Sequence, residues 1–573
     1  MKKIFKSFSV LLLLLAFACD LNKDLNNPNE ISVSGADVNL IMNAVQLDFA
    51  DFYWAASQAT AGLMRHNAMT GGFRYQTSYQ PQSVDGLWNL AYSNVLVNAE
   101  TMIPKAAAVG LTTHVAVGKI LEAYTYITLV DVFGDVPQSE ALQAGTGNFN
   151  PIATGGADVY TYALTLLTDA RTELAKTGTA IGGALPRDIY YSGDRSKWTA
   201  LANSLELKVQ MNLAMIPASA AAANARIAAL LGSNLVDSEA ENFTYKYGTA
   251  TVPSGSRHPW YDQYYGSNAG QAGGYINNGF MYELFQGKPD PANPTDPTKF
   301  NQDPRWRWYF YRQMGSIDIM NKTDPKALGC TKAAPPVHYA SFPSFCVFDP
   351  GFYGRDHGDA SGTPPDSPFL TCAGVYPAGG RADNTSTSNT QYLGATKRGD
   401  GANGAGILPI YMSFYTDYVK AEVKARAGNT AGAYTDLVNG ITNSITQVQN
   451  FAILKIAASG AVPAGGITLS RIPSTANYIS SVNYLYTNAA KKLDIIGREF
   501  WIATWGNSVE AYNSYRRTSA PSIMQPTIQT GAGPWLRSQT YPAVYVNLNA
   551  NATQKDYQTT NKVFWDTNPD NLN

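Results

Sequence analysis

Apolar residues recur at intervals of three and four in several stretches of the N-terminal half of the chain. The clearest stretch runs from Val117 to Ile127, and two others run from Tyr160 to Leu174 and from Trp198 to Leu213. This spacing is typical of amphipathic α-helices. We therefore predict three helices, each with one buried stripe, and we assign the apolar and aromatic residues of the stripes to the core.

The same period returns after Leu408, in YMSFYTDYVKAEVKARAG, in AYTDLVNGITNSITQVQNFA and in a stretch that ends with REFWIATWGNSVEAYNSYRRTSAP. The predicted helices come in pairs separated by Gly, Pro and Asn, as in antiparallel hairpins that bury their stripes by stacking. Their spacing is irregular, so the chain is not a repeat of fixed length. The pattern predicts a mainly α protein built on a scaffold of helical hairpins.

Three other segments lack helical period. Residues 128–142, TLVDVFGDVPQSEAL, leave a helix and turn at Gly134, which predicts a loop across the helical face. Residues 244–406 are rich in Pro, Gly, Asp and aromatic residues, and so long an irregular stretch inside a compact protein usually carries function. The C-terminal segment WLRSQTYPAVYVNLNANATQ is predicted to be extended.

The N-terminus has the features of a secretory signal. Three lysines precede a short apolar run around Leu11–Leu15, and the small residues Ala16 and Ala18 mark a cleavage site. Cys19 follows directly, where a cysteine can accept a diacylglyceryl group, and two or more acyl chains hold a protein stably on a bilayer. We expect lipidation at Cys19; the alternative is ordinary cleavage beside an incidental cysteine.

Composition narrows the classes of ligand. The chain has 42 basic and 43 acidic residues, which gives no basic face for nucleic acid. Charged residues are only 15% of the chain, whereas typical soluble proteins have about 25%. The 35 tyrosines and 10 tryptophans suit a surface that touches neutral polar ligands, although such a composition is also common in secreted proteins.

The remaining cysteines are Cys330, Cys346 and Cys372. An odd set cannot pair completely. One disulfide is plausible in an oxidising compartment, and Cys330 with Cys346 would close the shorter loop. No spacing of Cys or His residues indicates a zinc site.

Several linked motifs resemble the SusD/RagB family of nutrient-binding outer-membrane lipoproteins. They are the signal with Cys19, the loop VDVFGDVPQSEAL, and the segments IYYSGDRSKWTALANSLELKVQMNLA, GRDHGDASGTPPDSP with GVYPAGG, and REFWIATWGNSVEAYNSYRRTSAP. The resemblance spans nearly the whole chain, in the family's order. It implies a tetratricopeptide-like helical scaffold with a loop-rich ligand face, anchored in the outer membrane and facing the cell exterior.

The resemblance also implies a partner and a division of the chain. Such proteins cover a SusC-like TonB-dependent transporter, capture a nutrient and pass it to the pore. We expect a signal peptide over 1–18, a lipidated tether over 19–36 and one SusD-like domain over 37–573. Within that domain we expect helical hairpins over 37–243, a ligand-face insert over 244–406, and C-terminal helices with an extended tail over 407–573.

Binding of a carbohydrate requires flat aromatic faces beside neutral hydrogen-bonding groups. Two clusters in the insert meet this description on sequence, and their candidate contacts are Trp260, Tyr261, Tyr264 and Tyr265, followed by Trp306 and Trp308. Core packing is the alternative for both. The second cluster alternates with period two, which would also fit a half-buried strand.

An early loop offers a third candidate. Residues 64–75 are rich in Gly and contain Arg74 and Tyr75. The family resemblance implies that a loop of this kind lies beside the ligand face, so both residues are plausible ligand contacts. An ordinary connection between helices is the alternative.

The run from Tyr353 to Asp359, with the later Asp366, carries the densest set of charges. Asp356, Asp359 and Asp366 lie around glycine turns and could supply oxygen ligands to calcium, although they do not follow the EF-hand pattern. Arg355 could instead pair with Asp359 and hold the loop in shape. Direct contact with the ligand is a third possibility for this run.

These features favour a non-catalytic receptor for a carbohydrate or a peptide nutrient. A helical adaptor of a surface complex without a nutrient of its own is a second hypothesis, and a lipid-anchored glycosidase with two flanking carboxylates is a third. No nucleophile elbow, zincin helix or phosphate-binding loop appears in the sequence. We therefore expect no enzymatic activity and no cofactor apart from calcium.

Overall fold

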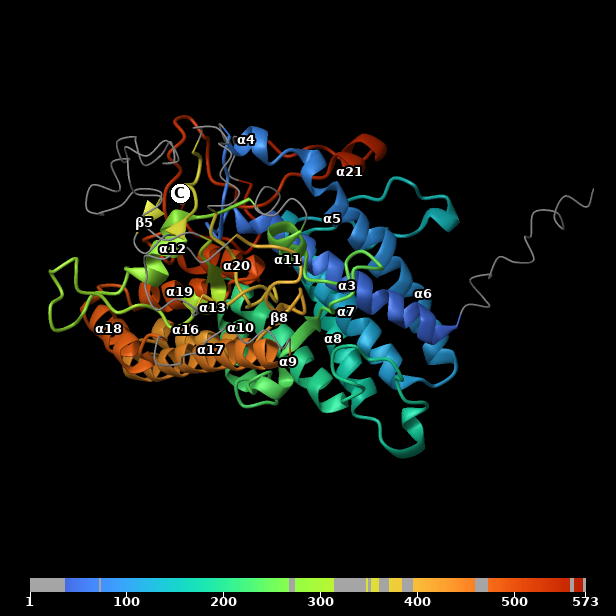
Figure 1. Ribbon diagram of the computed structural model, residues 1–573. Coiled ribbons are helices and arrows are strands. Elements are labelled where there is room, and N and C mark those ends of the chain that lie inside the picture. The colour runs from blue at the N-terminus through green and yellow to red at the C-terminus, as the bar shows by residue number, and fades with distance from the viewer. Residues whose placement is uncertain are drawn as a thin grey trace, which may run out of the picture.

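A computed structural model describes residues 37–71, 74–266, 274–313, 347–348, 352–359, 370–383, 395–458, 472–556 and 561–569 (Figure 1). Helices dominate both ends of this range. The N-terminal helices are α3 (Val38–Ala61), α4 (Tyr75–Ser78), α5 (Asp85–Asn89), α6 (Val97–Ala108), α7 (Thr112–Phe133), α8 (Gly156–Leu174), α9 (Arg195–Leu213) and α10 (Ala220–Leu230). A π-helix, η3 (Leu90–Leu96), joins α5 to α6. The short 3-10 helices are η2 (Pro81–Val84), η4 (Ala144–Thr146), η5 (Gly178–Ile181) and η6 (Glu239–Glu241).

The C-terminal part is also helical, whereas the middle holds only short helices. The middle helices are α11 (Pro259–Tyr265), α12 (Asn278–Phe285) and α13 (Trp306–Tyr309). The C-terminal helices are α16 (Ser413–Arg426), α17 (Thr430–Ala458), α18 (Thr475–Asn488), α19 (Lys492–Ala503), α20 (Ser508–Thr518) and α21 (Ala543–Leu548). The prediction of a mainly α fold with helical hairpins and a loop-rich insert is confirmed.

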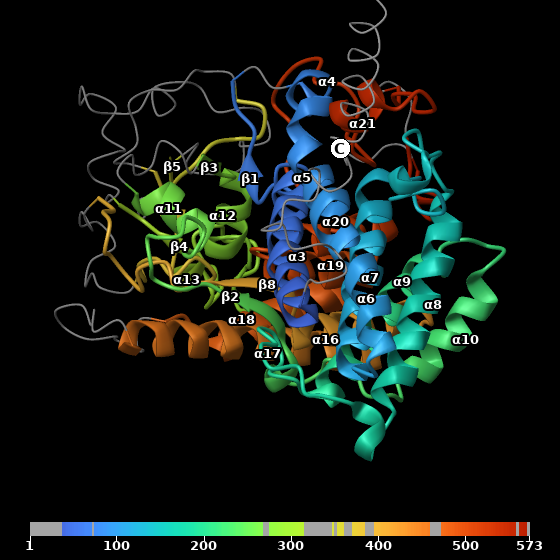
Figure 2. The same cartoon turned by 90° about the vertical axis from the view of Figure 1, so that its right-hand side faces the viewer.

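The three helices predicted from apolar period correspond to α7, α8 and α9. α7 packs against α3, α6, α8 and α9, and Figure 2 shows these N-terminal helices side by side. The prediction of a single buried stripe was wrong for α7, because every residue from Thr112 to Phe133 is buried except Lys119. The neighbours of α7 surround it, so helical period alone could not reveal its central place.

Local signals fix where some of these helices begin. Asp194 precedes α9, and its carboxylate accepts hydrogen bonds from the backbone N–H groups of Ser196 and Lys197 at 3.0 and 3.3 Å. Asp37 caps α3 in the same way, through the N–H of Asn39. Such caps satisfy N–H groups that have no partner inside the helix.

Strands are short, and those in the described part pair two by two in antiparallel fashion. They are β1 (Asn67–Ala68) with β3 (Tyr275–Ile276), β2 (Phe243–Lys246) with β8 (Ile407–Tyr411), β4 (Phe310–Tyr311) with β7 (Cys372–Ala373), and β5 (Val347–Phe348) with β6 (Phe352–Tyr353). The pairing of β2 with β8 joins the start of the loop-rich insert to its end. The insert therefore leaves the helical body and returns to it at one place.

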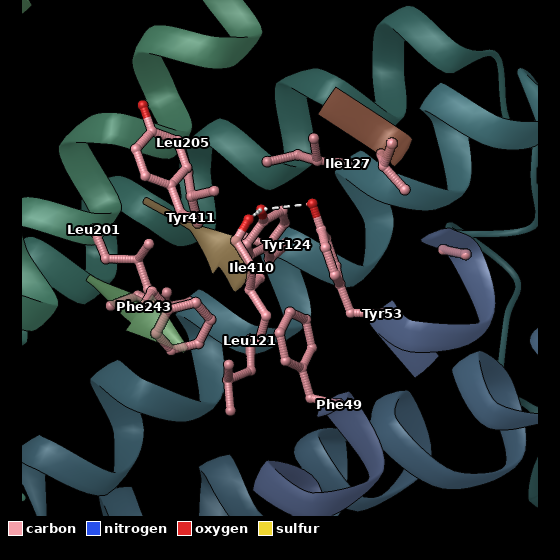
Figure 3. Packing of buried hydrophobic residues seen from close by; sticks show 14 of the residues in the cluster. Phe49, Tyr53, Leu121, Tyr124, Ile127, Leu201, Leu205, Phe243, Ile410 and Tyr411 are labelled. Atoms are coloured by element: carbon pink, nitrogen blue, oxygen red, sulfur yellow. Dashed lines mark hydrogen bonds between the residues drawn. The ribbon is translucent and has the colours of Figure 1, made fainter. Parts of the chain in front are cut away.

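The two larger hydrophobic cores meet at this junction, because most of the strand pair belongs to the first core and Ile407 belongs to the second. Figure 3 shows part of the first core, where Phe49, Tyr53 and Tyr124 from the helices meet Phe243 and Ile410 from the strand pair. The Tyr124 hydroxyl donates to that of Tyr53 at 3.2 Å. The second core contains many of the aromatic residues of the insert together with residues of α19 and α20.

α20 contributes to both cores and also carries buried charge. Burial alone would raise the pKa of Glu422 on α16, but the guanidinium groups of Arg517 and Arg426 outweigh it and lower the pKa to about 2. Arg517 binds both oxygens of that carboxylate at 2.9 and 2.8 Å. Arg516 donates to the backbone oxygen of Asp131 at 2.6 Å, which ties the Tyr-Arg-Arg-Thr sequence to the C-terminal end of α7.

Three sequence predictions need correction or a statement of scope. The run from Trp306 to Tyr309 was weighed as a half-buried strand, but it forms the short helix α13 and is fully buried, because aromatic residues on both of its sides belong to the second core. The segment predicted to be extended near the C-terminus contains α21. Cys372 is free and buried, whereas Cys19, Cys330 and Cys346 lie outside the described residues.

None of the helices in the described ranges combines the length and the apolar character needed to cross a membrane.

Candidate functional site

The aromatic cluster on α11 packs inside the second core. Trp260 is 3% exposed and lies 5.5 Å from Trp54 and 4.7 Å from Trp505, measured between ring centroids. Tyr261 and Tyr265 stack on each other at 4.8 Å. Tyr264 is also buried. These four rings were predicted ligand contacts, but with both faces packed they have no surface on which a sugar could stack, so we assign them to the core.

The second predicted cluster is also buried. Trp306 and Trp308 are both 0% exposed. The guanidinium groups of Arg307 and Arg312 lie 4.3 and 5.1 Å from the Trp306 ring, close enough for cation–π attraction. The Trp306 ring, which the sequence suggested as a ligand contact, is therefore in contact with arginine side chains of the same chain.

The structure separates the two candidates of the early loop. Arg74 is exposed and directly precedes α4. Tyr75 is buried, and its hydroxyl accepts a hydrogen bond from Arg65 at 2.9 Å. Tyr75 therefore helps to hold the loop, whereas contact between Arg74 and a ligand stays a prediction.

The acidic run is folded against the protein. Arg355 pairs with Asp359 at 2.7 Å, as the structural interpretation of this run required. Asp356 accepts hydrogen bonds from the amides of Gln525 at 2.6 Å and Asn278 at 3.5 Å. The residues that the structure describes contain no group of three or more His, Cys, Asp or Glu side chains that could hold a metal. Asp366 lies outside them, so the calcium site stays a prediction.

An open groove of about 330 Å³ lies elsewhere, on the helical body. It is built from three segments that are distant in sequence: residues 88–93, residues 137–151 and residues 544–549. Figure 1 shows the first and the last of these segments next to each other, where α21 lies beside α5. A volume of this size falls in the usual range for sites of small ligands.

Aromatic rings form the floor of the groove. The Trp88 ring lies 4.6 Å from that of Tyr92 and 4.7 Å from that of Tyr545, and both pairs are tilted by less than 40°. The Tyr92 hydroxyl donates to the backbone oxygen of Pro137 at 2.7 Å. Burial raises the pKa of Tyr92 well above its usual value, so this hydroxyl stays protonated and keeps its role as donor.

The local backbone explains how these rings come together. Residues 85–89 form one short α-helix, and the chain then widens into the π-helix η3, which carries Tyr92 and Ser93. π-helical turns cost stability and are frequent at functional sites. Asp85 at the start of α5 accepts a hydrogen bond from the N–H of Val544 at 3.1 Å and so holds α21 beside the floor.

The rim of the groove is exposed and carries no ionised group. Phe149 is 69% exposed and Leu548 is 78% exposed. Asn89 and Ser93 are also exposed, and within the described part of the chain neither side chain has a hydrogen-bond partner. The groove thus offers apolar surfaces beside free neutral donors and acceptors, the combination that an uncharged polar ligand requires.

Sequence reasoning missed this site. It noted residues 128–142 as a loop across the helical face, and it noted the C-terminal segment that contains Tyr545, but it linked neither segment to Trp88. The signal available was the run DGLWNLAYS, in which Trp88 and Tyr92 alternate with the polar Asn89 and Ser93 at a spacing of four. Only the fold shows that the three segments meet.

Comparison with known proteins shows what the chain resembles. Residues 28–284 match the sequence model of a SusD-like family described as "Starch-binding associating with outer membrane". A SusD/RagB family protein from Bacteroides thetaiotaomicron has the same fold, with a TM-score of 0.58 at 15% identity over 90% of this chain and 95% of the other. Residues 28–284 are thus similar to the SusD-like family, and the chain has the SusD-like fold.

Other solved structures extend the likeness over the chain. A chitin-binding SusD homolog from Flavobacterium johnsoniae aligns with a TM-score of 0.59 at 18% identity, covering 92% of this chain and 99% of its own. A structure titled "Bacteroidetes AC2a SusD-like" aligns with a TM-score of 0.62 at 16% identity, covering 93% and 100%. At such identities the alignments establish the fold. No curated protein matches the sequence.

Proposed function

We propose that this SusD-like protein binds a glycan at the cell surface and delivers it to a SusC-like TonB-dependent transporter, and that the groove over Trp88 is its binding site. The observation that carries the proposal is the groove itself, in which an aromatic floor meets exposed neutral donors and acceptors. The family description names starch, and the Flavobacterium johnsoniae homolog is titled chitin-binding. Both support a carbohydrate as ligand.

The geometry suits a sugar in two respects. One face of a pyranose ring is largely apolar, and it gains free energy when it covers an aromatic or aliphatic surface such as that of Phe149 or Leu548. The hydroxyls at the ring edge need hydrogen-bond partners when water is removed, and Asn89 and Ser93 supply them. An open groove also leaves room for a sugar chain to extend beyond it.

Binding without catalysis is part of the proposal. A glycosidase places two carboxylates on opposite sides of the scissile bond. Among the residues that line this groove, none is an Asp or a Glu. The groove is therefore suited to hold a sugar chain and has no groups positioned to cleave it.

Anchoring by lipid at Cys19 and partnership with the transporter complete the proposal. Both rest on the signal sequence and on the family. A Cys19→Ala variant should move from the membrane fraction to the soluble fraction. If it stays with the membrane in cells that lack the transporter, lipidation at Cys19 is not the anchor.

Affinity electrophoresis of the mature protein tests the binding site. Gels would contain soluble starch, glycol chitin, arabinoxylan, galactomannan or a peptide digest. We expect at least one glycan to retard the protein, and we expect Leu548→Ala to reduce the retardation. Leu454→Ala is the matched control, because Leu454 is another exposed leucine on a helix, 68% exposed and away from the groove.

Three outcomes separate the hypotheses. Retardation by a glycan that Leu548→Ala weakens and Leu454→Ala leaves intact supports the proposal. Retardation that neither substitution changes places the site elsewhere. If no glycan or peptide binds while the transporter still co-purifies with the protein, the adaptor hypothesis replaces it.

A further inference from the structure

Ionised side chains are scarce on the segments that build the groove. Residues 85–93, 135–151 and 541–549 contain only Asp85, Asp135 and Glu140 as charged residues. The residues that line the groove include none of the three. The charge that the groove presents to a ligand therefore depends on the positions of these three carboxylates.

Each of them accepts hydrogen bonds from the backbone of its own surroundings. Asp85 binds the N–H of Val544 at 3.1 Å, and Asp135 binds the N–H of Gly156 at 2.8 Å. Glu140 accepts from the N–H of Ile152 at 3.1 Å and from the amide of Asn148 at 3.2 Å. In each case one oxygen of the carboxylate is bonded to the wall of the groove, and none of the three residues lines the groove itself.

The nearby cation Lys555 is engaged in the same way. Its ammonium donates to the backbone oxygens of Phe133 and Gln539, the latter at 3.0 Å, and to the Ser538 hydroxyl at 3.1 Å. It also lies 4.5 Å from the centre of the Tyr541 ring. Three acceptors match the three N–H bonds of an ammonium, so Lys555 has no donor left for a ligand, and burial lowers its pKa to about 7.

A charged ligand in this groove would lose water without gaining a partner of opposite charge. Removing hydration from an unpaired charge is costly, whereas neutral hydroxyls and acetamido groups can be satisfied by the exposed amides and hydroxyls. Resting on the proposed function, we propose that the groove selects uncharged glycan segments. It discriminates against polysaccharides that carry carboxylate, sulfate or ammonium groups.

Matched polymers test this selectivity. The mature protein would be run at 150 mM NaCl in gels with soluble starch against carboxymethyl starch, glycol chitin against glycol chitosan, and dextran against dextran sulfate. Binding to the groove is the part of the retardation that Phe149→Ala removes. We expect this part to be at least tenfold weaker for the charged member of each pair that binds. The cationic glycol chitosan controls for repulsion between the protein and polyanions.

The outcomes distinguish this inference from the proposed function. If a charged polymer binds the groove as tightly as its neutral counterpart, the selectivity is wrong and glycan binding stands. If charged polymers alone bind the groove, the selectivity is also wrong. If no polymer of either kind binds, both the inference and the proposed function fail.

A charge placed in the groove sharpens the test. Asn89→Lys adds a cation at the exposed rim and should raise binding to carboxymethyl starch relative to starch by about tenfold, an effect that high salt reduces. Asn483→Lys, which adds the same charge at an exposed position on α18, should leave the ratio unchanged. A ratio that stays the same in Asn89→Lys, or that rises equally in both variants, would overturn the role of groove charge.

Discussion

The insert and the groove use the same kinds of residue in opposite ways. In the insert, Trp306 and Trp308 are fully buried, and arginines of the same chain lie against the Trp306 ring. In the groove, Trp88, Tyr92 and Tyr545 form a floor whose rim, at Phe149 and Leu548, is open to solvent. In the sequence, both regions consist of aromatic residues interspersed with polar residues.

The difference arises from what covers each cluster. The rings of the insert belong to one core with residues of α12, α19 and α20, and those predicted as ligand contacts are at most 3% exposed. The rings of the groove are supported from below by the first core, and no helix among the described residues closes the opening at Phe149. Trp88 and Tyr545 are themselves only 7% and 6% exposed, so the apolar surface open to a ligand is chiefly that of Phe149 and Leu548 at the rim.

The largest loss of stability should come from a substitution in the insert. Trp306→Ala removes a fully buried ring and leaves the guanidinium groups of Arg307 and Arg312 without its face, so the free energy of unfolding should fall by about 3–5 kcal/mol. Denaturation in urea, followed by circular dichroism, measures the change. A variant of wild-type stability that binds glycan less tightly would show that Trp306 is a ligand contact after all.

Acid should lower the free energy of unfolding of the whole protein, because Arg517, the partner of Glu422, lies on α20 and this helix contributes to both cores. The pKa of Glu422 is about 2 in the folded protein and near 4.5 in the unfolded chain. The unfolded state therefore binds more protons below pH 4.5, and the free energy of unfolding should decrease as the pH falls from 4.5 to 2.

The control for this pH effect is Glu422→Gln, which should be less stable at neutral pH and should lose less stability over that interval. Urea unfolding at a series of pH values provides the measurement. An equal pH dependence in the wild type and the variant would contradict the assigned role of the Glu422–Arg517 pair.

Phe149→Ala should separate binding from stability. Because the ring is 69% exposed, its removal should change the free energy of unfolding by less than about 0.5 kcal/mol. Loss of its contact with a sugar should weaken binding by about tenfold, or about 1.4 kcal/mol. Calorimetric titration with the glycan found by electrophoresis gives the affinity, and unchanged affinity would remove Phe149 from the site.

The smallest loss of affinity should come from a substitution in the wall of the groove. Glu140→Ala removes the acceptor for the N–H of Ile152 and the amide of Asn148, so the loop should become less ordered at a cost of about 1 kcal/mol. We expect a several-fold loss of affinity, and we expect Glu140→Gln, which keeps one oxygen acceptor, to lose less. If Glu140→Ala binds as the wild type does, this wall does not shape the site.

The sequence predicted the scaffold more fully than the site, for a physical reason. Helical period identified α7, α8 and α9, because the period is a local property of the chain. Burial of nearly the whole surface of α7 depends on the helices around it and is not encoded in its own period. The groove likewise requires Trp88 and Tyr545, which are more than 450 positions apart, to be brought together by the fold.

Composition misled the prediction of ligand contacts in the insert. Trp260 and its tyrosine neighbours have the residue types of a sugar-binding surface, but those same types make a dense core when helices cover both sides. Arg355 and Asp359 were correctly weighed as a pair, since a spacing of four within one loop already limits their separation.

Hydrogen exchange with and without a bound glycan tests the central claim most directly. The mature protein would be saturated with maltoheptaose or chitohexaose, whichever binds, and exchange would be followed by mass spectrometry. The account predicts slower exchange in residues 85–93, 138–151 and 543–549, with no change in 259–265 and 306–311. Slower exchange in the two segments of the insert, without protection of the groove, would contradict it.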